Sequence, residues 1–165
     1  MHRTGQVLLA LALLVVLPLQ AAISESSPEV SLPRPSVQQQ PQDVVSIVVK
    51  ALANNDEPFA DAGITTTFGF ASPANRVNTG PLAKFTKMLR NPAYAILIDH
   101  VEREFSEVVR TEHQAYQLVR IVGRDGNQVV FAFRLSRQAD GEFEDMWMTD
   151  AVWPVASGNI PEQAF

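Results

Sequence analysis

Hydrophobic positions along the chain change period near residue 100. Before it, apolar side chains recur every three or four residues over 43–54, 58–71 and 79–90, which is the spacing of one helix face. The first stretch is the clearest, because its apolar stripe continues from Val44 to Leu52. We therefore predict three helices in the first half of the chain.

Local signals mark the ends of the second and third helices. Asp56 is expected to cap the second helix, which Gly63 weakens. Thr79 is expected to cap the third, with Pro81 in its first turn. A proline at position 92 then ends it.

After residue 100 the pattern alternates with period two, as in strands that bury one face. Four strands are predicted, over 101–109, 116–122, 129–135 and 146–155. The Asp-Gly pair within residues 124–127 predicts a tight hairpin of type I′. Helices followed by an antiparallel meander define an α+β fold, with three N-terminal helices packed on a curved antiparallel sheet of about four strands.

The N-terminal part of the chain has the pattern of an export signal. Residues 7–17 are an unbroken apolar run behind a short basic start, too short for a comfortable membrane span. We predict a signal peptide or anchor over 1–22 and a Pro/Ser/Gln-rich tether over 23–41. The α+β domain then covers 42–155, and 156–165 form a tail. The domain is thus expected to be exported, and to meet a membrane only through an uncleaved N-terminal segment.

Charge and composition exclude several classes of function. The formal net charge is −5 and the arginines are scattered, so no nucleic-acid partner is expected. The chain has no cysteine, which excludes a thiol nucleophile and a thiolate metal site. Beyond the N-terminal segment the only histidines are His100 and His113, so no metal and no cofactor are expected.

Several short motifs resemble a known family. They are the sequence FASPANR at 70–76, TGP at 79–81 followed by Phe85, LSRQADG at 135–141 and WMTD at 147–150. Together they resemble a family of small domains of unknown function from photosynthetic organisms, with a layout similar to the nuclear transport factor 2-like (cystatin-like) fold. The resemblance covers about residues 42–155. It implies a conical cavity between helices and sheet, and it implies no reaction, because this fold serves enzymes, binders and assembly modules alike.

Arg134, Asp150 and Tyr94 are candidate ligand-binding residues. Arg134 shares a strand face with Val130 and Ala132. If that face lined the cavity, Arg134 could pair with Asp150 or hold a ligand carboxylate with both of its terminal nitrogens. The alternative is that both charges lie on a solvent-facing surface.

Trp147 and Arg76 complete the set of candidate ligand-binding residues. Trp147 and Trp153 are expected to share a face with Thr149, either in a pocket or in the core. Arg76 lies in the expected turn before the third helix, where it could serve the structure or a ligand. No catalytic residue and no metal ligand is assigned.

The most favoured function is the non-catalytic binding of a small apolar or amphipathic molecule in the cavity, pairing of two copies through the sheet, or both. The predicted strand 129–135 is apolar on both faces, which is typical of a strand covered on both sides. Two alternatives stay open. One is an enzyme of the isomerase, dehydratase or cyclase type that uses an acid in the cavity. The other is a structural or assembly factor.

Overall fold

The computed structural model describes residues 31–156, 158, 160 and 163–165. The predicted signal or anchor at 1–22 lies outside these residues, as do positions 23–30 of the predicted tether. No helix within the described part of the chain is long and apolar enough to cross a membrane.

Four helices precede an antiparallel sheet, which confirms the predicted α+β class. The helices are α1 (Pro41–Ala53), α2 (Ala62–Gly69), α3 (Pro73–Thr79) and α4 (Leu82–Leu89), with short 3-10 turns η1 (Ala95–Leu97) and η2 (Gly141–Phe143). The strands are β1 (Glu102–Phe105), β2 (Val109–Arg110), β3 (Gln114–Val122), β4 (Gln128–Arg137) and β5 (Trp147–Val155). Their order is β1-β3-β4-β5, and β2 also pairs with β3.

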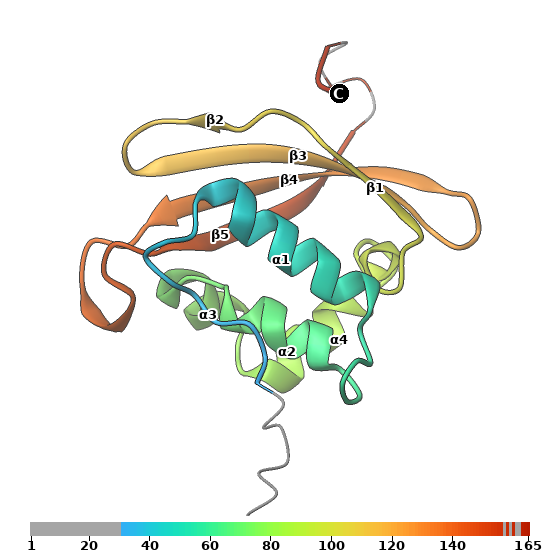
Figure 1. The fold of residues 1–165 in the computed structure, drawn as a ribbon. Coiled ribbons are helices and arrows are strands. Elements are labelled where there is room, and N and C mark those ends of the chain that lie inside the picture. The colour runs from blue at the N-terminus through green and yellow to red at the C-terminus, as the bar shows by residue number, and fades with distance from the viewer. Residues whose placement is uncertain (1–30, 157, 159, 161–162) are drawn as a thin grey trace, which may run out of the picture.

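The helices all lie on one side of the curved sheet, with α1 nearest to it and α2, α3 and α4 beyond (Figure 1). The core fills the space between α1 and the sheet. It combines one stripe of α1 with the helix-facing side chains of β3 and β4, whose fully buried members include Val48, Leu52, Val119, Phe131, Phe133 and Leu135. Burial of side chains of this size contributes about 1.5–3 kcal/mol each, so this layer dominates the stability of the domain.

Helices α1 and α2 meet in a close contact that only glycine permits. A Cβ atom on Gly63 would lie 2.2 Å from the main-chain oxygen of Ala51. Asn55 fixes the connecting turn, because its side chain accepts from the Ile64 amide at 3.1 Å and donates to Asp61 at 2.9 Å. Gly63 lowers helix propensity, as expected from the sequence, yet it is what allows α2 to pack on α1.

The helix boundaries differ from the predicted ones around α3. Residues 73–79, expected to form a turn, are a helix whose N-cap Ser72 accepts a hydrogen bond from the Asn75 amide at 3.2 Å. Thr79 ends α3 instead of capping the next helix, and α4 begins at Leu82. The predicted cap of α2 is also wrong, because the side chain of Asp56 accepts from the Asp61 amide at 3.0 Å and thereby holds the loop.

The predicted strand at 101–109 is divided in two by Ser106. Its hydroxyl accepts a hydrogen bond of 2.9 Å from the Leu118 amide, in place of a regular ladder bond. The side chain of Gln117 donates to the Ser106 main-chain oxygen at 2.9 Å. Side-chain bonds of this kind compete with the regular strand ladder, and β1 and β2 result.

The hairpin between β3 and β4 is present but is not of type I′. A type I′ turn needs positive φ at two successive residues. Here Gly126 has a φ of 78°, while Asp125 is not among the residues with positive φ. The Gly126 amide instead donates to the oxygen of Gly123 at 3.0 Å. Gly126 is therefore the last residue of the turn and not one of its two central residues.

A β-bulge at Asp150 shifts the pairing of β5. Before it, Thr149 pairs with Leu135, whereas after it Ala151 pairs with Arg134 and Trp153 with Ala132. One extra residue in β5 therefore exchanges the faces of all side chains that follow it. The expectation that Trp147 and Trp153 share a face is wrong for this reason: Trp147 lies in the core, and Trp153 lies on the helix-free face.

Candidate functional site

A cavity of about 350 Å³ lies between the helices and β5, the edge strand of the sheet. Its inner wall is apolar and is formed by side chains of α1, α4, η1 and β4. They are Val48, Leu52, Phe85, Leu89, Leu97 and Phe133. Its mouth is polar, since the exposed Asn78 of α3 and the half-buried Asp150 of β5 also line it. The cavity thus has an apolar interior that opens to solvent beside the sheet edge.

The edge of β5 is partly closed at this point by the connection between α2 and α3. The Thr149 amide donates to the oxygen of Phe70 at 2.8 Å, and the Ser72 amide donates to the oxygen of Thr149 at 2.9 Å. The side chain of Asn75 gives that same oxygen a second bond of 3.0 Å. These bonds set α3 beside the cavity mouth.

The hydroxyl of Thr149 is the unusual group in this cavity. Thr149 is 5% exposed, and its Oγ1 has no hydrogen-bond partner among the described residues. Leaving a buried hydroxyl unpaired costs about 1–3 kcal/mol. By contrast, the hydroxyl of Thr67, which lines the same cavity, donates to the oxygen of Gly63 at 2.8 Å.

Three of the five predicted site residues line this one cavity, namely Tyr94, Arg134 and Asp150. The Tyr94 hydroxyl donates to the oxygen of Val152 at 3.2 Å. One oxygen of the Asp150 carboxylate accepts from the Ser136 hydroxyl at 2.9 Å. Both groups are thus oriented by neighbouring residues of the sheet.

Arg134 and Asp150 do not pair with each other, although both lie at the mouth. Every ion pair within 4.0 Å in the described part of the chain joins other residues. Arg134 starts on the helix-free face, opposite Ala151. Both Arg134 and Ala151 line the cavity.

The other two predicted residues lie elsewhere. Trp147 is buried in the core, 6% exposed, and does not line this cavity. Arg76 donates from Nε to the oxygen of Phe68 at 3.1 Å and also bonds the oxygen of Gly69, so it satisfies the C-terminal end of α2. Its guanidinium lies over the rings of Phe68, at 5.6 Å, and Phe143, at 5.0 Å.

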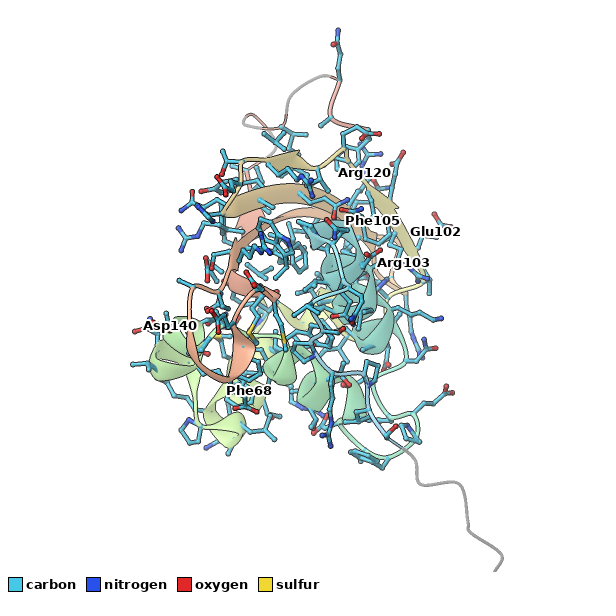
Figure 2. All side chains as sticks on the ribbon, turned by 60° about the vertical axis from the view of Figure 1, so that its left-hand side comes forward. Phe68, Glu102, Arg103, Phe105, Arg120 and Asp140 are labelled. Atoms are coloured by element: carbon cyan, nitrogen blue, oxygen red, sulfur yellow. The ribbon has the colours of Figure 1, made fainter. Side chains whose placement is uncertain are left out.

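The stacked Arg76 joins the helical layer to the loop between β4 and β5. Phe68 lies among the helices, and Asp140 marks the loop where it comes down beside them (Figure 2). Burial lowers the pKa of Arg76, while nearby Glu142 opposes that shift. The guanidinium of Arg76 therefore has a structural role.

His100 is a second buried polar group, outside the cavity. It is 5% exposed; its Nδ1 lies 2.8 Å from the oxygen of Leu97, and its Nε2 has no partner within the described ranges. Burial lowers the pKa of His100, which favours the neutral ring. No group of three or more acidic or histidine side chains within the described residues could hold a metal ion.

Sequence reasoning missed Thr149 and Asn75 as cavity residues. Thr149 was expected only to share a face with the tryptophans, and Asn75 precedes Arg76 in the stretch that was expected to form a turn. The Ser-Pro pair at 72–73, a cap followed by proline at the first helical position, could have revealed α3 and so placed Asn75 on a helix.

A family model described as "Domain of unknown function (DUF4864)" matches residues 37–156. The chain belongs to the DUF4864 family. No curated protein and no solved structure matches it. The DUF4864 match includes every element from α1 to β5, and therefore the whole cavity.

Proposed function

We propose that this DUF4864 protein binds a small, mainly apolar molecule in the cavity between its helices and β5, without acting on it chemically. The observation that carries the proposal is the unpaired, buried Oγ1 of Thr149 in a cavity whose inner wall is mainly apolar. Small-molecule sites are mostly apolar pockets with a few placed polar groups. A bound molecule would supply the partner that this hydroxyl lacks.

The proposal includes a fold of the nuclear transport factor 2-like type. Helices on one face of a curved antiparallel sheet, with a cavity between the two, support it. Export of the domain and an origin in photosynthetic organisms stay predictions. An isomerase-type reaction would use the hydroxyl of Tyr94 and the acid Asp150. Binding is favoured over catalysis because both groups already make hydrogen bonds, Tyr94 to Val152 and Asp150 to Ser136.

The test is the binding of a neutral apolar dye, N-phenyl-1-naphthylamine, followed by its fluorescence. Met88→Trp places a larger side chain in the half-buried lining of the cavity and should abolish the specific dye signal. Lys87→Trp is the matched control, because Lys87 is next to Met88 in sequence but is exposed and does not line the cavity. The measured quantity is the difference between the two variants, which cancels any dye bound by the apolar N-terminal segment. Equal dye binding by both variants would overturn the proposal.

We also propose that two copies pair through the helix-free face of the sheet. Tyr116, 42% exposed, and Trp153, 38% exposed, lie on that face, where Leu118 and Ala132 are their apolar neighbours. Aromatic side chains are enriched in protein interfaces. Sedimentation equilibrium should show a dimer that Trp153→Glu dissociates, and a strict monomer at high concentration would exclude pairing.

A further inference from the structure

We propose that the ligand of this cavity carries a zwitterionic head group on an apolar body, as does an α-amino acid with a large apolar side chain. This inference rests on the proposed binding function and specifies its ligand. Arg134 would hold the carboxylate, Asp150 would hold the ammonium group, and the apolar body would enter the cavity.

The first support is the pair of unlinked opposite charges at the mouth. Arg134 is half-buried and makes no ion pair within 4.0 Å, and no side-chain hydrogen bond, with any other residue of the described ranges. The guanidinium presents a fixed set of donors that fits a carboxylate. Two other arginines of the sheet, Arg120 and Arg137, are paired with Glu104 and Asp145.

The second support is that Asp150 is close in the fold yet is used differently. It occupies the bulge next to Ala151, the strand partner of Arg134, and Ser136 binds only one of its oxygens. The second oxygen is left for a ligand. A ligand with a carboxylate alone would bring like charge to Asp150, and one with an amine alone would bring like charge to Arg134. A zwitterion satisfies both.

The third support is the shape and chemistry of the interior. A volume of about 350 Å³ is in the range of small-molecule sites. The wall beyond the mouth is formed by Leu52, Phe85, Leu89 and Phe133, which suits an apolar side chain. The free hydroxyl of Thr149 lies one residue before Asp150, where it can add a hydrogen bond to the head group.

The experiment is titration calorimetry of the full chain with three probes that share a phenylethyl body. They are L-phenylalanine, 3-phenylpropanoate, which lacks the ammonium group, and 2-phenylethylamine, which lacks the carboxylate. We expect phenylalanine to bind at least about tenfold more tightly than either analogue, because each loses a charge-assisted hydrogen bond. Equal or tighter binding of one analogue would overturn the inference.

Variants of the two charged residues give an independent readout. Arg134→Gln and Asp150→Asn should each weaken phenylalanine binding about tenfold or more, while Arg103→Gln, an exposed residue at the opposite sheet edge, should leave it unchanged. A ligand that needs only a carboxylate would bind Asp150→Asn more tightly, which contradicts the inference. If the neutral dye binds in the Met88-dependent way but none of the three probes binds, the zwitterion is wrong and the binding function stands. If neither dye nor probe binds, both fail.

Discussion

The side-chain nitrogen of Asn75 lies 3.0 Å from the main-chain oxygen of Thr149 and donates a hydrogen bond to it. The bond connects α3 to β5 across 74 positions of sequence. No residue of α3 is buried, so apolar packing contributes little to holding this helix in place. A few polar bonds therefore position the helix that forms one side of the cavity mouth.

Removing that bond should loosen α3 selectively. We expect Asn75→Ala to lower the free energy of unfolding by about 1 kcal/mol, the usual worth of one hydrogen bond. Hydrogen exchange of the α3 amides should become faster than that of α1. Asn78→Ala is the control, because the side chain of the exposed Asn78 bonds only to Ala74 within its own helix. Equal acceleration in both variants would show that Asn75 does not anchor α3.

The unpaired hydroxyl of Thr149 should cost stability when the cavity is empty. Thr149→Val removes it while keeping the shape, so we expect the free energy of unfolding to rise by about 1 kcal/mol. Thr67→Val should instead lower it, because the Thr67 hydroxyl is bonded to Gly63. Denaturant unfolding measures both changes. A Thr149→Val variant as destabilised as Thr67→Val would mean that the hydroxyl already has a partner.

Two glycines of α2 should respond in opposite ways to alanine. At Gly63 the new methyl group would lie 2.2 Å from the oxygen of Ala51, so α2 must move, at a cost of about 1–3 kcal/mol. At Gly69 nothing lies within 4 Å of the added atom, and alanine should stabilise by about 0.5–1 kcal/mol. Thermal melts of both variants test the difference. A tolerated Gly63→Ala would contradict the close contact of α1 and α2.

His100 should make the fold sensitive to mild acid. Burial lowers the pKa of His100 in the folded chain below the ordinary value of about 6.5. As pH falls below that value, the unfolded chain takes up the proton first. Stability is therefore full above about pH 6.5 and decreases below it, down to the lowered folded-state pKa.

The measurement is the free energy of unfolding between pH 8 and pH 5. His100→Asn keeps a donor for the oxygen of Leu97 and cannot titrate. The free energy of unfolding of this variant should therefore fall less between pH 8 and pH 5. His113→Asn, at an exposed position, should keep the full decrease. The same pH profile for the chain and for His100→Asn would rule out this role for His100.

The period of the hydrophobic pattern was enough to predict the fold class and all the strands of the sheet except the break at Ser106. The break could not be predicted, because it depends on a hydrogen bond between Ser106 and the distant Leu118. Helix α3 was missed because none of its side chains is buried, so it leaves no apolar stripe in the sequence.

The candidate site was predictable in part. Arg134, Asp150 and Tyr94 were named as candidates for one cavity, and all three line it. Arg76 and Trp147 carry equally suggestive side chains, but the carbonyl groups at the end of α2 engage the first, and the core buries the second. No local sequence pattern distinguishes an arginine that donates to main-chain oxygens from one whose guanidinium is free to bind a ligand.

The bulge at Asp150 determines which side chains at the end of β5 face the helices. Strict alternation would count Val152 outward and Trp153 inward, and one additional residue reverses that count. Deleting position 150 would leave Val152 inward and Trp153 outward, because Ala151 already pairs with Arg134. If Asp150 were kept and paired with Arg134 instead, the later residues would shift by one position, and the indole of Trp153 would enter a space that valine now fills. In this strand, the number of residues is information in its own right, separate from their identity.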